Sequence, residues 1–286
     1  MPTPALIADT TIHDVMPADG GEPWRVFIYV PPEPAPEAGW PVLYMADGNA
    51  VIGTAVDAVR AQASYPSGSN VGWGVIIAIG YPVAGAYDPL RRSWDLGPPP
   101  GQTYPPFHDG GPDVRTGGAQ KFLAFIEEEL KPFVASLAKI DRNRQAFYGH
   151  SFGGLFALYA LFTRPRAFGT WIAASPAIYW EHRAIDRFLE AFEADVPRNL
   201  GAEIILSAGE YETEKLAPFQ IGAADEQKRL EHKKVTRADE FARLMAARLD
   251  AIPGLGASFE LHAGENHMSI LPVTVNRAVQ AAFRMK

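Results

Sequence analysis

Short apolar runs alternate with segments of helical periodicity along most of the chain, and this alternation limits the folds open to it. In the first run, residues 25–30, polar and apolar residues alternate as in an outer strand. The other runs have the composition of strands that are buried on both faces. The runs fall at residues 25–30, 42–46, 75–79, 145–148, 170–174 and 203–207. This order predicts a mainly parallel central sheet with helices on both faces, in one α/β domain spanning 1–286.

The clearest helical segment covers residues 118–137. Its apolar side chains, among them Phe122, Phe125 and Leu130, recur on one helical face, and a run of glutamates occupies the other. Pro132 lies inside this segment. Because proline lacks an N–H and clashes with the preceding turn, we expect it to kink or divide the helix.

Two stretches, 81–116 and 212–236, interrupt the alternation of strands and helices. The first is rich in Gly and Pro, and the second is charged and partly helical. Long connections of this kind are more often functional covers than idle loops. We therefore predict that both are cover insertions, with surface decoration as the alternative.

Composition excludes several classes of protein. The 286 residues contain no cysteine, which rules out disulfides, thiolate zinc sites, iron–sulfur clusters and a cysteine nucleophile. The formal charge of −7 disfavours nucleic acid and anionic lipid as partners. Since no secretory signal or long apolar span is found either, we predict a cytoplasmic protein without membrane or nucleic-acid partners.

The sequence GHSFG at 149–153 is a G-x-S-x-G element between an apolar run and an apolar helical segment. In this context the pattern predicts a sharp strand-to-helix turn that exposes the hydroxyl of Ser151 as a nucleophile. The glycines permit the close packing that such a turn requires. The amide of Phe152, at the start of the helix, is then free to stabilise an oxyanion.

A serine nucleophile needs a base, and His267 is the best placed of the seven histidines. It lies in a predicted loop between the strand-like run 258–263 and the last helical stretch, 273–284. Surface or packing roles are expected for the remaining histidines, which are His13, His108, His150, His182, His232 and His262.

The order serine, acid, histidine places a carboxylate between Ser151 and His267. Glu210 and Glu212 both follow the apolar run 203–207, and chemistry alone does not separate them. A second oxyanion donor is also needed. We predict the amide of Asn49, which follows a tight Asp-Gly pair at the end of a buried strand, with a plain turn as the alternative.

In these features the chain resembles the siderophore esterases of the α/β-hydrolase superfamily, which open catecholate trilactones of the enterobactin, salmochelin and bacillibactin type. The resemblance implies the α/β-hydrolase fold and favours Glu212 over Glu210 as the acid, although some members act as Ser–His dyads. It rests on VLYMADGN (42–49), the Arg92-x-x-Asp95-Leu96 element, GGAQKFLAFIEEELKP (117–132), GHSFGG (149–154), SPAIYW (175–180), GEYE (209–212) and GENHMS (264–269).

Three residues are candidates for substrate binding under this resemblance. Arg92 and Trp94 form a plausible cationic and aromatic rim for an aryl-bearing acid, and Trp180 closes the SPAIYW motif. The alternative for Arg92 is a structural ion pair with Asp95.

The predicted function is that of a serine carboxylic-ester hydrolase acting through an acyl-enzyme, without metal or organic cofactor. Catecholate siderophore trilactones and other aryl or acyl esters are the candidate substrates. One rival is a feruloyl or acetyl carbohydrate esterase, or an acyltransferase, on the same core. Another, of a different class, is a siderophore-binding protein without turnover.

Overall fold

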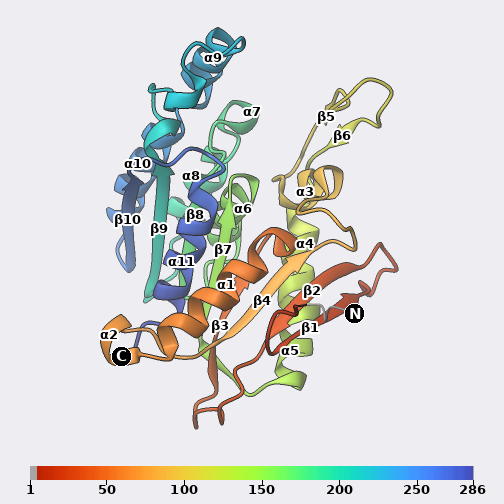
Figure 1. Cartoon of the computed structure of the whole chain (residues 1–286), viewed down its shortest axis with the longest axis vertical. Coiled ribbons are helices and arrows are strands. Elements are labelled where there is room, and N and C mark those ends of the chain that lie inside the picture. The colour runs from red at the N-terminus through yellow and green to blue at the C-terminus, as the bar shows by residue number, and fades with distance from the viewer. Residues whose placement is uncertain (1–4, 286) are drawn as a thin grey trace. The chain divides into compact units, whose positions relative to one another are not determined.

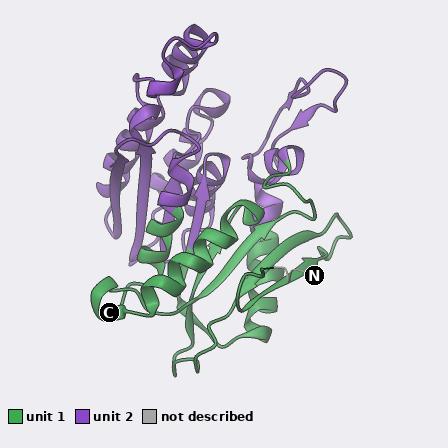
Figure 2. Cartoon of the chain, in the orientation of Figure 1, with its two compact units in different colours: residues 1–88, 124–146, 275–286 green, residues 89–123, 147–274 purple. Residues whose placement is uncertain are grey.

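The computed structural model describes residues 5–285. The chain forms two compact units. Unit 1 comprises residues 1–88, 124–146 and 275–286, and unit 2 comprises residues 89–123 and 147–274 (Figure 2). Each unit draws on segments from separate parts of the chain. The predicted single domain stays a prediction.

Unit 1 contains strands in the order β1-β2-β4-β3 (Figure 1). The pairs β1–β2 and β2–β4 are antiparallel, and β3–β4 is parallel. The strands β3 and β4 are buried along their whole length, as the apolar runs predicted. The strands are β1 (Thr10–Val15), β2 (Trp24–Tyr29), β3 (Trp40–Met45) and β4 (Val75–Gly80), and the helices α1 (Gly48–Ala63) and α2 (Pro66–Ser69).

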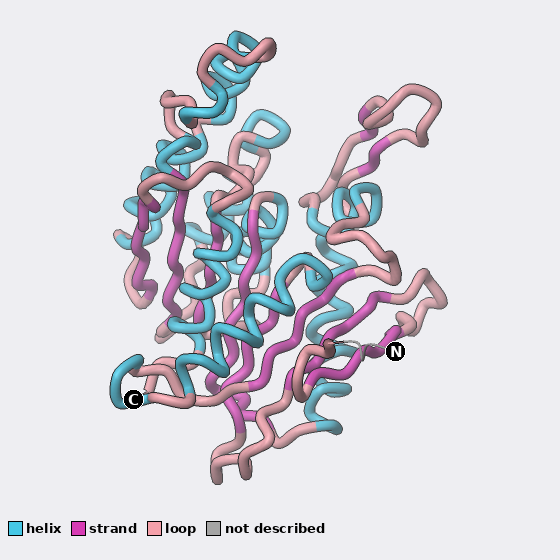
Figure 3. The backbone as a smooth tube through the Cα atoms, in the orientation of Figure 1, coloured by secondary structure: helices cyan, strands magenta, loops and turns pink. Residues whose placement is uncertain are grey.

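Unit 2 continues with strands in the order β7-β8-β9-β10, of which β8–β9 and β9–β10 are parallel. Strand β7 (Ile140–His150) begins in unit 1 and ends in unit 2. The other strands are β8 (Thr170–Ala174), β9 (Ala202–Gly209) and β10 (Leu255–His262). Helix α10 (Ala238–Asp250) packs on β9 and β10, and helix α6 (Phe152–Thr163) packs on β8 (Figures 1 and 3).

The remaining helices of unit 2 follow its strands along the chain. They are α6 (Phe152–Thr163), α7 (Trp180–Arg183), α8 (Asp186–Ala194), α10 (Ala238–Asp250) and the 3-10 turn η2 (Glu210–Glu212). Helix α11 (Ile270–Ala282) extends from unit 2 into unit 1.

The helix predicted over 118–137 is divided into three parts. An α-helix, α4 (Ala119–Phe125), leads into a π-helical segment, η1 (Ile126–Leu130), and α5 (Lys131–Leu137) follows. Pro132 stands at the start of α5, where a missing N–H disturbs the helix least. The prediction that this helix is divided near Pro132 is confirmed, and a π-helical turn joins the two α-helical parts.

The two irregular stretches contain short helices and a hairpin. Residues 81–116 form helix α3 (Pro89–Leu96) and a short hairpin of β5 (Thr103–Tyr104) and β6 (Val114–Arg115). Residues 212–236 contain the 3-10 turn η3 (Pro218–Gln220) and helix α9 (Glu226–Thr236). Within residues 5–285, no helix is both long and apolar enough to cross a membrane.

Candidate active site

Ser151 stands alone between the end of β7 and the start of α6, with φ 58° and ψ −113°. Its N–H donates to the carbonyl of Ala174 at 2.9 Å, which holds the turn against β8. A Cβ atom on Gly149 would lie 2.0 Å from the carbonyl oxygen of Gly153. Only glycine fits there, so the motif forms the sharp turn predicted from the sequence.

His267 comes from the loop between β10 and α11 and reaches the serine. Its Nε2 lies 3.1 Å from Oγ of Ser151, and its Nδ1 lies 2.5 Å from Oε1 of Glu212. The imidazole thus bridges a hydroxyl and a carboxylate. This is the geometry in which a base takes the serine proton while a carboxylate fixes its tautomer.

Glu212 lies in η2, directly after β9, and is only 6% exposed. Besides the contact with His267, its Oε2 accepts the N–H of Gly209 at 2.7 Å and the hydroxyl of Ser175 at 2.5 Å. Burial would raise the pKa of Glu212, but the hydrogen bond and charge of His267 and the other two hydrogen bonds outweigh it and lower the pKa. The carboxylate is therefore held in its charged form.

Glu210, the alternative acid, faces elsewhere. Its carboxylate pairs with Lys215 at 3.1 Å and accepts the N–H of Gly264 at 2.9 Å. The sequence did not decide between the two glutamates. In the structure Glu212 contacts the imidazole, whereas Glu210 lies at the surface and holds the loop before His267 through its hydrogen bond to Gly264.

Ser175 is a member of the site to which the sequence analysis assigned no role. It is 1% exposed and has a φ of 43°, which is unusual for a residue with a side chain. Its N–H donates to the carbonyl of Ser207 at 2.8 Å, so the start of the SPAIYW motif is held beside β9. That motif, directly after a buried strand, was the only signal in the sequence.

The ring of His150, for which the sequence analysis expected a surface or packing role, packs against that of His267. Its side chain is buried, and its ring centroid lies 4.7 Å from that of His267.

The two predicted oxyanion donors lie in different units. Phe152 is the first residue of α6, so its amide has no acceptor within the helix. Asn49 lies in unit 1, in the first turn of α1, and its side chain bonds the backbone of Tyr81 and Val83. Its role as a second donor stays a prediction.

Two of the three predicted substrate residues, Arg92 and Trp180, lie next to the ring of Phe152. The guanidinium of Arg92 lies 5.9 Å from the centre of that ring, and the ring of Trp180 lies 4.5 Å from it. The ring of Trp180 also contacts that of Tyr104, with 5.1 Å between the ring centres. These residues form an aromatic and cationic surface beside the nucleophile.

Trp94 has different neighbours. The guanidinium of Arg115 lies 4.9 Å from the centre of its ring, and a Cβ on Gly118 would lie 2.4 Å from its Nε1. These contacts tie α3 to β6 and the start of α4, which indicates a packing role.

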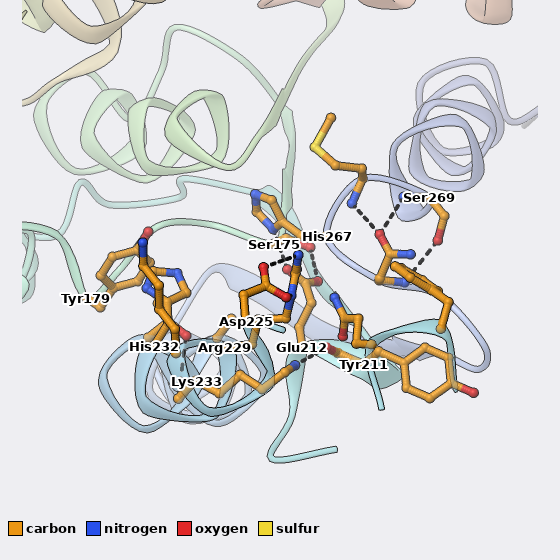
Figure 4. A pocket seen from close by; sticks show the side chains of 17 residues that line it. Ser175, Tyr179, Tyr211, Glu212, Asp225, Arg229, His232, Lys233, His267 and Ser269 are labelled. Carbon is orange, nitrogen blue, oxygen red and sulfur yellow. Dashed lines mark hydrogen bonds and ion pairs between the residues drawn. The ribbon is translucent and has the colours of Figure 1, made fainter. Parts of the chain in front are cut away.

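A cavity of about 880 Å³ adjoins the site within unit 2. His267 and Glu212 line one part of it, and helix α9 contributes Arg229, His232 and Lys233 (Figure 4). Tyr179 adds an aromatic surface. Burial and the charge of His267 lower the pKa of His232, so its ring is mainly neutral at pH 7. Residues 5–285 hold no cluster of three or more His, Asp or Glu suited to a metal ion.

Comparison with known proteins identifies the family of the chain. A family model described as "Putative esterase" matches residues 19–245. The ferri-bacillibactin esterase BesA of Bacillus subtilis is 36% identical, over 97% of this chain and 90% of that protein. The siderophore triacetylfusarinine C esterase of Aspergillus fumigatus is 35% identical, over 93% of this chain and 90% of that protein.

Solved structures give the same result. The BES protein of Bacillus cereus superposes with a TM-score of 0.83 at 30% identity, covering 100% of this chain and 99% of that one. The resemblance and the fold class predicted from the sequence are both confirmed. The chain belongs to the putative esterase family, among its siderophore esterases, and is a carboxylic-ester hydrolase with the α/β-hydrolase fold.

Proposed function

We propose that the chain hydrolyses siderophore esters through a covalent acyl-enzyme on Ser151. The observation that carries this proposal is the continuous hydrogen-bonded path from Ser151 through His267 to Glu212. Nε2 of His267 takes the hydroxyl proton as Oγ attacks the ester carbonyl, and Glu212 stabilises the imidazolium that forms. The amide of Phe152, the first residue of α6, stabilises the oxyanion.

The second half of the reaction uses the same groups. The imidazolium gives its proton to the oxygen of the leaving alcohol as the carbon–oxygen bond breaks, which leaves the acyl-enzyme. Water then attacks the acyl-enzyme with His267 again acting as the base, and the imidazolium returns its proton to Oγ of Ser151 as the bond to the acid breaks. Because Glu212 is already ionised and oriented, no rearrangement of the acid is needed between the two halves.

The substrate class is supported by the relatives and by the surface beside the nucleophile. Two relatives that match almost the whole chain are named for ferri-bacillibactin and for triacetylfusarinine C. Arg92, Trp180 and Phe152 present a cation and aromatic rings, which suit an aryl-bearing, anionic acyl group. We therefore propose catecholate siderophore trilactones as the first substrates to test.

The test compares the parent protein with Ser151→Ala on bacillibactin, triacetylfusarinine C and phenyl benzoate, each followed by chromatography of the released acid. We expect the parent to cleave bacillibactin and the variant to be slower by several orders of magnitude. An added alcohol acceptor reports any transfer reaction. Absence of released acid from all three esters with the parent protein would refute the proposal.

A further inference from the structure

The position of His267 determines on which side of the reaction centre the alcohol part of the ester must lie. When the tetrahedral intermediate collapses, the carbon–oxygen bond breaks and the leaving oxygen takes the proton from Nε2. That oxygen must therefore lie within hydrogen-bond reach of the imidazole. The rest of the leaving alcohol extends beyond it, on the histidine side of Ser151.

A cavity of about 880 Å³ adjoins the imidazole of His267. It is lined by His267 and by its neighbours Asn266 and Met268, whereas neither Ser151 nor Phe152 lines it. The aromatic surface of Trp180 and Arg92, in contrast, packs on Phe152, next to the nucleophile. The two surfaces are thus separate, and each adjoins a different part of the catalytic path.

Two of the cations that line the cavity are engaged by neighbouring groups. The guanidinium of Arg229 pairs with Asp225 at 2.7 Å. The ammonium of Lys233 donates to the carbonyl oxygens of Tyr211 and Thr213, which ties α9 to the turn that carries the catalytic acid. Neither cation is therefore available to a ligand without the loss of an existing contact.

Lys228, the third cation of the cavity wall, is differently placed. Its side chain is exposed, and its ammonium makes no ion pair or hydrogen bond with the residues that the structure describes. The hydrogen bond from Arg229 is the main cause that lowers the pKa of Asp225, and the charge of Lys228 makes the smallest contribution. The ammonium of Lys228 can thus turn to an anion in the cavity at little cost.

The same wall is rich in aromatic surface. Tyr179, Tyr211 and Phe219 line the cavity, and Phe219 is 70% exposed. An exposed phenylalanine at the edge of a cavity offers apolar area to a flat ligand. Aromatic rings combined with an available ammonium suit a ligand that is both aromatic and anionic.

We propose that this cavity is the subsite for the leaving alcohol, and that it selects an alcohol carrying an aromatic ring and a negative charge, with Lys228 as the cation that meets that charge. The assignment rests on the proposed serine esterase function. It divides the substrate into an acyl part beside Trp180 and an alcohol part beside α9.

The experiment uses three esters that differ in where the charge is placed: phenyl benzoate, 4-sulfophenyl benzoate and phenyl 4-sulfobenzoate. The value of kcat/KM is measured for the parent, for Lys228→Glu and for the milder Lys228→Gln. For Lys228→Glu we expect the ratio of 4-sulfophenyl benzoate to phenyl benzoate to fall about tenfold, since an attractive charge becomes a repulsive one. Lys228→Gln should lower it about threefold.

Lys234→Glu is the matched control. Lys234 lies on the same helix, does not line this cavity, and pairs with Glu231 at 3.3 Å. The Lys234→Glu substitution changes the net charge by the same amount as Lys228→Glu, so it reports the long-range electrostatic field alone. We expect its ratio of 4-sulfophenyl benzoate to phenyl benzoate to stay within about twofold of the parent's. Phenyl 4-sulfobenzoate, with its charge on the acyl part, should respond to Lys228→Glu less than about threefold.

Two results would overturn the assignment: an unchanged ratio in Lys228→Glu, or an equal loss with both anionic esters. Failure of the esterase function is seen separately. In that case no ester, bacillibactin included, is cleaved faster by the parent than by Ser151→Ala, whatever the ratios are.

Discussion

The hydroxyl of Ser175 lies 2.5 Å from Oε2 of Glu212, whereas His267 contacts the other oxygen of that carboxylate. Ser175 makes this contact from a left-handed backbone conformation, with φ 43°, and is almost fully buried. A non-glycine residue in this conformation costs free energy, and the conformation persists only where other interactions compensate for that cost. The hydrogen bond to the buried acid is the compensating interaction, and it orients the carboxylate toward the imidazole.

Removal of the Ser175 hydroxyl should lower kcat about tenfold and leave KM nearly unchanged, because the acid loses one of the groups that orient it. Ser175→Ala and Ser175→Gly distinguish this effect from backbone strain. Both lack the hydroxyl, but glycine adopts a positive φ freely. We expect equal losses of kcat, with Ser175→Gly having the higher melting temperature. A clearly more active glycine variant would contradict the role of the hydroxyl.

Replacement of the acid should separate a triad from a Ser–His dyad. Glu212→Gln keeps the shape of the side chain but cannot stabilise the imidazolium, so we expect kcat to fall by about 10⁴. Glu210→Gln is the matched control, because Glu210 contacts Lys215 and Gly264 rather than the imidazole. Its kcat should stay within about threefold of the parent. A loss of less than about tenfold in Glu212→Gln would favour the dyad.

The lowered pKa of Glu212 makes a prediction about acid stability. The unfolded chain, with a pKa near 4.5 at this position, takes up a proton at higher pH than the folded chain does. The contribution of Glu212 to the free energy of unfolding is therefore complete above the unfolded pKa and is lost as the pH falls through the folded pKa. Urea unfolding between about pH 3 and pH 7 should show a shallower loss in Glu212→Gln than in the parent, and parallel curves would contradict this.

The tight turn at the nucleophile should tolerate no side chain at Gly149. A Cβ there would lie 2.0 Å from the Gly153 carbonyl, so the backbone must shift and Ser151 must move. We expect Gly149→Ala to lose about 2–3 kcal/mol of stability and more than about a hundredfold in kcat.

Gly53→Ala is the control for that substitution. Gly53 lies inside α1, and a Cβ added to it would meet no atom within 4 Å, so alanine should stabilise the protein by about 0.5–1 kcal/mol. Thermal unfolding and steady-state kinetics of both variants test this pair. A Gly149→Ala protein with the parent's kcat would refute the steric argument.

The sequence by itself determined the features that depend on residues close together along the chain. The apolar runs predicted the strands, since burial on both faces requires a continuous apolar segment. The GHSFG element predicted the turn at Ser151, because only glycine fits beside it. His267 was identifiable because it occupies a predicted loop between the last strand and the last helix.

The tertiary structure alone decided which groups meet across long separations. Glu212 and Glu210 have the same chemistry and similar positions, and only burial and the approach of His267, 55 residues along the chain, distinguish them. Ser175 reaches the same carboxylate from 37 residues away. No local pattern encodes such contacts, because they depend on how β8, β9 and the loop after β10 come together. The cavity beside α9 depends on the same packing, and it gives Lys228 its proposed role.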